Sequence, residues 1–131
     1  MNEFNRILIL LQNDLQQLDT RTNPERIRYK LYPIYTNLLL NKNFFKSNND
    51  IKHLCNYLSL TFKDYVYRSR TLLVARIIRS IERADQKDLL TYVEVAQKYI
   101  YAYNDKAEKN IKNSNSNTKS NFIDKFGRNN G

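Results

Sequence analysis

Glycine and proline are scarce: the 131-residue chain has two of each, against an average usage of about 7% and about 5%. Sheet proteins need turn residues often, so this scarcity favours long helices over many short strands. Both glycines, Gly127 and Gly131, lie at the very end of the chain. Glycine loops that hold phosphates in P-loop or dinucleotide sites are therefore excluded. The length predicts one domain, large enough to bury a core, with at most a tail.

Cysteine and histidine each occur once. A lone Cys55 excludes an intramolecular disulfide and indicates a reducing compartment, which we take to be the cytoplasm. Cys55 lies on an apolar stripe, and core packing is favoured over a reactive thiol. His53 lacks the further ligands that a metal site requires. The acidic residues are scattered singly and no nucleophile elbow is present, so neither catalysis, a metal nor another cofactor is expected.

Long hydrophobic runs are also lacking. The most apolar segment near the N-terminus, Ile7 to Leu11, is too short to span a bilayer and has no small-residue cleavage site after it. We therefore expect neither a signal peptide nor membrane insertion.

Positive charge is what the chain has in excess, with a formal net charge of +9. Such a charge suggests nucleic acid, an anionic membrane surface or an acidic protein as partner, or simply a solvated basic coat. Residues 62–83 hold six Lys or Arg against two acids, which is +4 of that total. This segment is also strongly apolar, so the partner question centres on it.

Apolar residues at helical spacing predict an all-α bundle of four to five helices over residues 1–104. The first helix is expected at about residues 2–19. The second begins at an Asn23 cap followed by Pro24 and runs to about residue 40, with a kink or break near Tyr32 because Pro33 lies inside it. In the connection that follows, Phe44 and Phe45 are expected to plug the core.

The third helix is expected to be capped by Asn49 or Asp50 and to continue through Phe62 and Val66. A break near residues 68–71, with Ser69 or Thr71 as the cap, is favoured over one long helix across residues 51–83. Asp85 and Asp88 approximate a capping box for a last helix. Residues 105–131, rich in Lys, Asn and Ser, predict a flexible tail. The apolar residues at its end form either a docking motif or a remnant without a role: Phe122, Ile123 and Phe126.

Arginines on one side of residues 68–83 form the main candidate site. Guanidinium groups bind phosphates bidentately, where lysine acts as a point charge. Neighbouring tyrosines would suit single-stranded nucleic acid, although tyrosines at this spacing are more often packing residues, and arginines can instead pair with acids of their own fold. The predicted nucleic-acid-binding residues are Arg68, Arg70, Arg76, Arg79 and Arg83, with a second group of Arg26, Arg28 and Lys30.

Three segments are similar to the small helical subunit that lines the guide–target duplex in type III-A CRISPR effector complexes. They are residues 26–31 (RIRYKL), residues 65–70 (YVYRSR), and Glu94 with Tyr99 and Tyr103. The spacing between the last two segments is short for that family, and the Lys/Asn-rich tail is extra. The resemblance implies a helical subunit that binds a nucleic-acid backbone.

The sequence thus predicts a non-catalytic nucleic-acid-binding protein or ribonucleoprotein subunit, with RNA or single-stranded DNA as the partner. The alternative is an adaptor that docks on an acidic protein, with the tail motif as a second contact.

Overall fold

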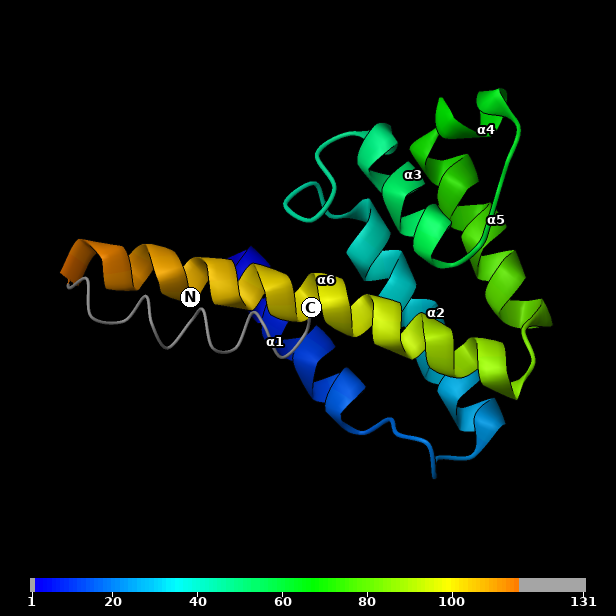
Figure 1. The fold of residues 1–131 in the computed structure, drawn as a ribbon, viewed down its shortest axis with the longest axis horizontal. Helices are drawn as coiled ribbons and strands as arrows, with labels where there is room; N and C mark the ends of the chain where they lie inside the picture. The colour runs from blue at the N-terminus through cyan, green and yellow to red at the C-terminus, as the bar shows by residue number, and fades with distance from the viewer. Residues whose placement is uncertain (1, 116–131) are drawn as a thin grey trace. The chain divides into compact units, whose positions relative to one another are not determined.

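The computed structural model describes the backbone of residues 2–115 and the side chains of residues 2–103. The predicted all-α class is confirmed, and residues 2–115 contain no strand. The elements are α1 (Glu3–Gln16), α2 (Pro24–Leu40), α3 (Asn48–Tyr57), α4 (Asp64–Tyr67), α5 (Arg70–Arg83) and α6 (Gln86–Asn115) (Figure 1). The predicted docking motif, Phe122, Ile123 and Phe126, lies outside the described residues.

The chain divides into two units, Met1–Ile100 and Tyr101–Gly131. Helix α6 continues to Asn115, past residue 104, where the sequence predicted that the bundle ends. Its continuation contains Lys, Ala and Glu, which have high helix propensity. The loss of the apolar stripe near residue 104 therefore did not mark the end of the helix.

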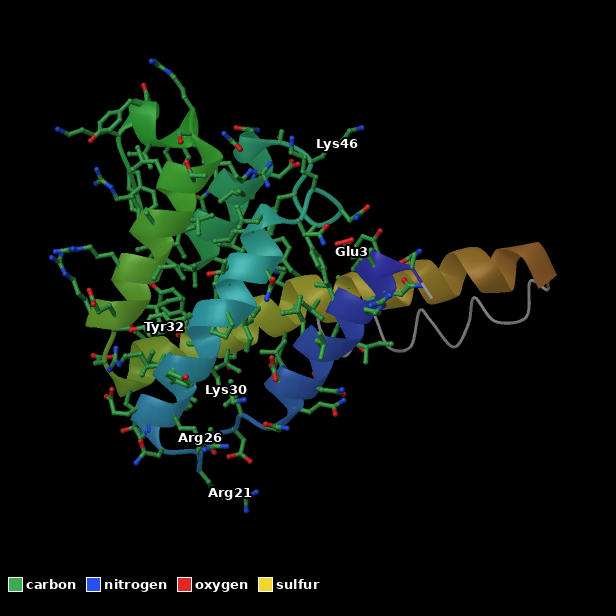
Figure 2. The ribbon with its side chains drawn as sticks, turned by 180° about the vertical axis from the view of Figure 1, so that it is seen from behind. Glu3, Arg21, Arg26, Lys30, Tyr32 and Lys46 are labelled. Atoms are coloured by element: carbon green, nitrogen blue, oxygen red, sulfur yellow. The ribbon has the colours of Figure 1, made fainter. Side chains whose placement is uncertain are left out.

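Helix α2 is the centre of the first unit, with α1 on one side of it and α5 on the other (Figures 1 and 2). Its apolar stripe is at most 1% exposed at Ile27, Leu31, Ile34 and Leu38. The first part of α6 also packs on α2, since the buried Tyr35 hydroxyl donates to the Tyr92 carbonyl at 2.7 Å. Helices α1, α5 and the first part of α6 therefore share one core built around α2.

Three predicted helix starts are confirmed by side-chain caps. Asn23 accepts from the Glu25 amide at 2.8 Å, Ser69 from Leu72 at 3.2 Å, and Asp85 from Asp88 at 2.8 Å. The third helix begins earlier than predicted, at Asn48. Ser47 is the cap of α3, and Asp50 completes a reciprocal capping box three residues later.

Two other helix boundaries differ from expectation. Helix α1 ends at Gln16, although Leu18 beyond it is still buried. The break near Tyr32 is absent, because α2 runs unbroken through Pro33. Pro33 is itself exposed, and buried residues flank it in sequence, so their packing outweighs the roughly 3 kcal/mol that an internal proline costs.

The largest departure lies between α3 and α5. Helix α3 ends at Tyr57, so the expected continuation through Phe62 and Val66 is wrong. The Leu60 backbone N–H donates to the Cys55 carbonyl at 2.9 Å, and the Ser59 N–H donates to the Asn56 carbonyl at 3.1 Å. Ser59 has a φ of 59°. This pair of bonds is the helix-ending arrangement that usually places glycine at the left-handed position. The expected break near residues 68–71 is confirmed.

The two phenylalanines of the α2–α3 connection, Phe44 and Phe45, have different roles. Phe45 is 1% exposed and its ring lies 5.0 Å from that of Tyr99, which confirms it as a core plug. Phe44 is only half-buried and packs against Phe4 at a ring distance of 5.3 Å. Cys55 is buried, as expected.

Stability at alkaline pH is expected to depend on Cys55. Burial raises the pKa of its thiol to about 11, against about 8.5 in an unfolded chain. The unfolded chain therefore loses this proton first, and the free energy of unfolding should fall as pH rises from about 8.5 towards 11. Urea unfolding at several pH values in this window would measure the slope.

Cys55→Ala is the matched variant for this prediction. It should lower stability at every pH through the lost packing but remove the thiol's part of the alkaline slope. The slope from tyrosines with raised pKa values, such as the half-buried Tyr99 with a pKa raised to about 12 by desolvation, should remain. Equal slopes for the two proteins would contradict the assignment.

No helix within residues 2–115 combines the length and apolar character needed to cross a membrane.

Candidate nucleic-acid interface

Helix α5 has two chemically distinct faces. Leu73, Ile77 and Ile81 are fully buried against the core. Val74 and Ile78, which flank this buried face, are only half-buried. On the other face lie the exposed side chains of Arg76, Arg79 and Arg83, which we call the arginine ridge. At a rise of about 1.5 Å per residue the ridge extends for about 10 Å along the helix.

A pocket of about 660 Å³ opens beside the arginine ridge. Its walls come from the α3–α4 connection, from α5 and from the start of α6. All three ridge arginines contribute to its lining. The remaining lining residues are Leu58, Ser59, Leu60, Ser80, Ala84, Asp88, Thr91 and Tyr92.

A hydrogen-bonded phenol closes the inner side of this pocket. Tyr92 is 4% exposed, and its hydroxyl donates to the Ser80 Oγ at 2.6 Å. Ser80 in turn donates to the Ile77 carbonyl at 2.6 Å. Burial raises the pKa of the Tyr92 hydroxyl, so it stays neutral. The hydroxyls of Tyr92 and Ser80 are thus satisfied internally, whereas the arginines at the rim are exposed and can meet a ligand.

A second, shallower hollow of about 440 Å³ lies on the other flank of the arginine ridge. Arg76 and Arg79 line it together with Tyr32 of α2 and Glu82 of α5. Figure 2 shows Tyr32 next to α5. The ridge therefore stands between two hollows.

Among residues 2–103, no carboxylate forms an ion pair with the arginine ridge. The ion pairs there join Arg21 to Asp19, Arg28 to Glu25 and Lys30 to Asp14. The nearest acids in the lining, Asp88 and Glu82, are exposed. Arg76 instead donates to the Tyr65 hydroxyl at 3.3 Å. Within the described side chains, the ridge charges are therefore uncompensated by any close acidic partner.

Arg28, predicted to bind nucleic acid, is directed inward. Its Nη1 donates to the Ile81 and Glu82 carbonyls at 2.7 and 2.9 Å, at the C-terminal end of α5. Its Nε and Nη2 donate to the Glu25 carboxylate at 3.1 and 3.2 Å. Those bonds raise the pKa of Arg28 and lower that of Glu25. With its side chain 18% exposed, Arg28 joins α2 to α5 and has few donors left for a phosphate.

Arg70 has a similar structural role. Its Nε donates to the Asn48 Oδ1 and its Nη1 to the Leu39 carbonyl, both at 2.8 Å. It therefore ties the start of α5 to the end of α2 and the start of α3. The sequence predicted Arg70 together with the other arginines, because a hydrogen bond to a carbonyl 31 residues away cannot be read from local spacing.

The other predicted residues are not brought to the arginine ridge. Arg68 is exposed after α4 and lines neither hollow. Arg26 and Lys30 lie along the first half of α2 (Figure 2), and Lys30 approaches Asp14 at 4.0 Å. Of the eight predicted residues, only Arg76, Arg79 and Arg83 line the larger pocket.

Sequence reasoning missed the residues that complete the pocket. Leu58 and Leu60 reach it because Ser59 turns the chain with a positive φ, and a serine does not signal such a turn. Thr91 and Asp88 reach it because α6 packs back beside α5. No group of three metal-ligating side chains exists among the described residues.

Comparison with known proteins adds no relative: no family model, curated protein or solved structure matches the chain.

Proposed function

We propose that the protein is a non-catalytic nucleic-acid-binding protein that engages the phosphate backbone through the arginine ridge. The observation that carries this proposal is the set of three exposed arginines, unpaired by acids among residues 2–103, at the rim of one pocket. Three guanidinium forks spread over about 10 Å reach more than one phosphate of a nucleic-acid backbone.

Two carboxylates moderate this surface without neutralising it. Asp88 lies in the first turn of α6, where a negative charge is favourable to the helix. Glu82 lies on the opposite flank of the arginine ridge. Both are exposed, so solvent screens them. The remaining positive potential suits a polyanion, and the chain's total charge of +9 would steer its approach.

The test is a salt titration of binding to a short labelled oligonucleotide. If the three ridge arginines each neutralise one phosphate, affinity should fall roughly 20- to 40-fold between about 50 and about 200 mM salt. The triple variant Arg76→Gln, Arg79→Gln and Arg83→Gln should lose most of this salt dependence and bind far more weakly at low salt.

A control variant with equal charge change makes the test specific. Arg6→Gln, Lys42→Gln and Lys46→Gln remove three exposed charges from α1 and the α2–α3 connection. This control should keep most of the affinity and salt slope. If both triple variants weaken binding equally, only overall charge matters. If the unaltered protein binds no oligonucleotide at low salt, the proposed function is wrong and an acidic protein becomes the partner to test.

A further inference from the structure

A half-exposed aromatic ring stands at one end of the arginine ridge. Tyr65, on α4, is 50% exposed, and its hydroxyl accepts a hydrogen bond from Arg76 Nη2 at 3.3 Å. That bond holds the phenol beside a guanidinium group. A ring fixed next to a phosphate-binding arginine is the arrangement on which a base stacks while its phosphate is bound.

The larger pocket offers a second surface for a base. Leu58, Leu60 and Ala84 give it an apolar lining beneath the guanidinium groups. Its volume of about 660 Å³ falls within the roughly 300–1,000 Å³ range of small-molecule sites. Apolar walls offer nothing to a phosphate, whereas the flat face of a nucleobase packs well against them.

We propose that the ligand of the arginine ridge is single-stranded nucleic acid, with one base stacked on Tyr65 and another held in the pocket. The proposal rests on the proposed function and specifies its ligand. The strand's phosphates follow Arg76, Arg79 and Arg83, and its unstacked bases turn to the flanks of the ridge. A duplex presents the same phosphates, but its bases are paired and stacked, so neither Tyr65 nor the pocket is used.

The Asp88 carboxylate gives the pocket a hydrogen-bond acceptor that also suits a base. Its exposed carboxylate lies in the lining together with Thr91. An ionised carboxylate only accepts hydrogen bonds, so it repels phosphate and matches the N–H donors of base edges, such as exocyclic amino groups and the N3–H of thymine. The pocket therefore separates the two parts of a nucleotide: arginines at the rim for the phosphate, apolar and acceptor groups inside for the base.

Three probes of equal length test this proposal: an oligothymidylate, a duplex, and a strand of abasic units. The abasic strand carries every phosphate and no base. Because each stacked base contributes a factor of about 5 to about 150 in affinity, the oligothymidylate should bind at least about tenfold more tightly than the abasic strand. The duplex should also bind more weakly than the oligothymidylate at equal salt.

Point variants then test whether one base binds at Tyr65 and another in the pocket. Tyr65→Leu, which keeps an apolar side chain but removes the ring, should weaken oligothymidylate binding about tenfold and weaken abasic-strand binding much less. Tyr65→Phe keeps the ring and should retain most of the affinity. Thr91→Phe fills the pocket and should also weaken binding to the oligothymidylate alone. The matched control is Tyr29→Leu, because Tyr29 is 74% exposed on α2 and lines neither hollow.

The outcomes separate this proposal from the proposed function. Equal affinities for all three probes would overturn the base contacts while leaving phosphate binding intact. Tighter binding of the duplex would overturn the single-strand assignment in the same way. Failure of all three probes to bind at low salt would remove the proposed function and this inference together. Thermal unfolding of each variant shows whether weaker binding reflects a damaged fold.

Discussion

Replacing Phe45 with alanine is expected to lower the free energy of unfolding by about 3–5 kcal/mol. The ring is 1% exposed and packs against Tyr99 of α6, so its removal leaves a cavity between the α2–α3 connection and that helix. A domain of this size is stable by only about 5–15 kcal/mol. The variant should therefore unfold at much lower urea concentration, with a similar dependence on urea.

Phe44→Ala is the control for this prediction. Phe44 is half-buried and contacts Phe4 of α1, so its loss should cost roughly half as much, in proportion to the apolar area removed from water. Comparable losses from the two variants would contradict the assignment of Phe45 as the residue that closes the core.

The sequence predicted the helices from spacing, because burying one face imposes the helical period on apolar residues. It predicted where helices begin when a capping residue stood next to a change of pattern, as at Asn23 and Ser69. It failed at residues 58–63. There the apolar period continued by coincidence, and the residue with positive φ was Ser59, for which no glycine gave a signal.

The same limit explains the candidate site. Spacing along one helix identified the ridge of Arg76, Arg79 and Arg83, since neighbours at three and four residues share a face. The sequence also predicted Arg70, and Arg28 in a second group, as ligand-binding residues, although each donates to carbonyls more than 30 residues away in the chain. Tertiary contacts decide whether an arginine is available to a ligand, and no local pattern contains them.

Because Arg28 is bonded within the fold and Arg79 is exposed, replacing each is expected to have opposite effects on stability and on binding. Arg28→Met should lower the free energy of unfolding by about 2–3 kcal/mol, because the partly buried Ile81 carbonyl loses a charged donor. Its affinity for an oligonucleotide, measured per folded molecule, should change little. Arg79→Met should do the reverse: stability within about 0.5 kcal/mol of the parent, as for most exposed substitutions, and clearly weaker binding with a lower salt slope.

The comparison requires both measurements on both variants. Urea unfolding gives the stability, and titration at a temperature where both proteins are folded gives the affinity. The Glu25 carboxylate supplies an independent reading, since its pKa is held low by the hydrogen bond from Arg28 and should rise towards its ordinary value in Arg28→Met. If that variant instead binds as weakly as Arg79→Met while remaining folded, Arg28 contacts the ligand directly. The ligand surface would then extend from α5 onto the start of α2, where Arg26 already lies exposed.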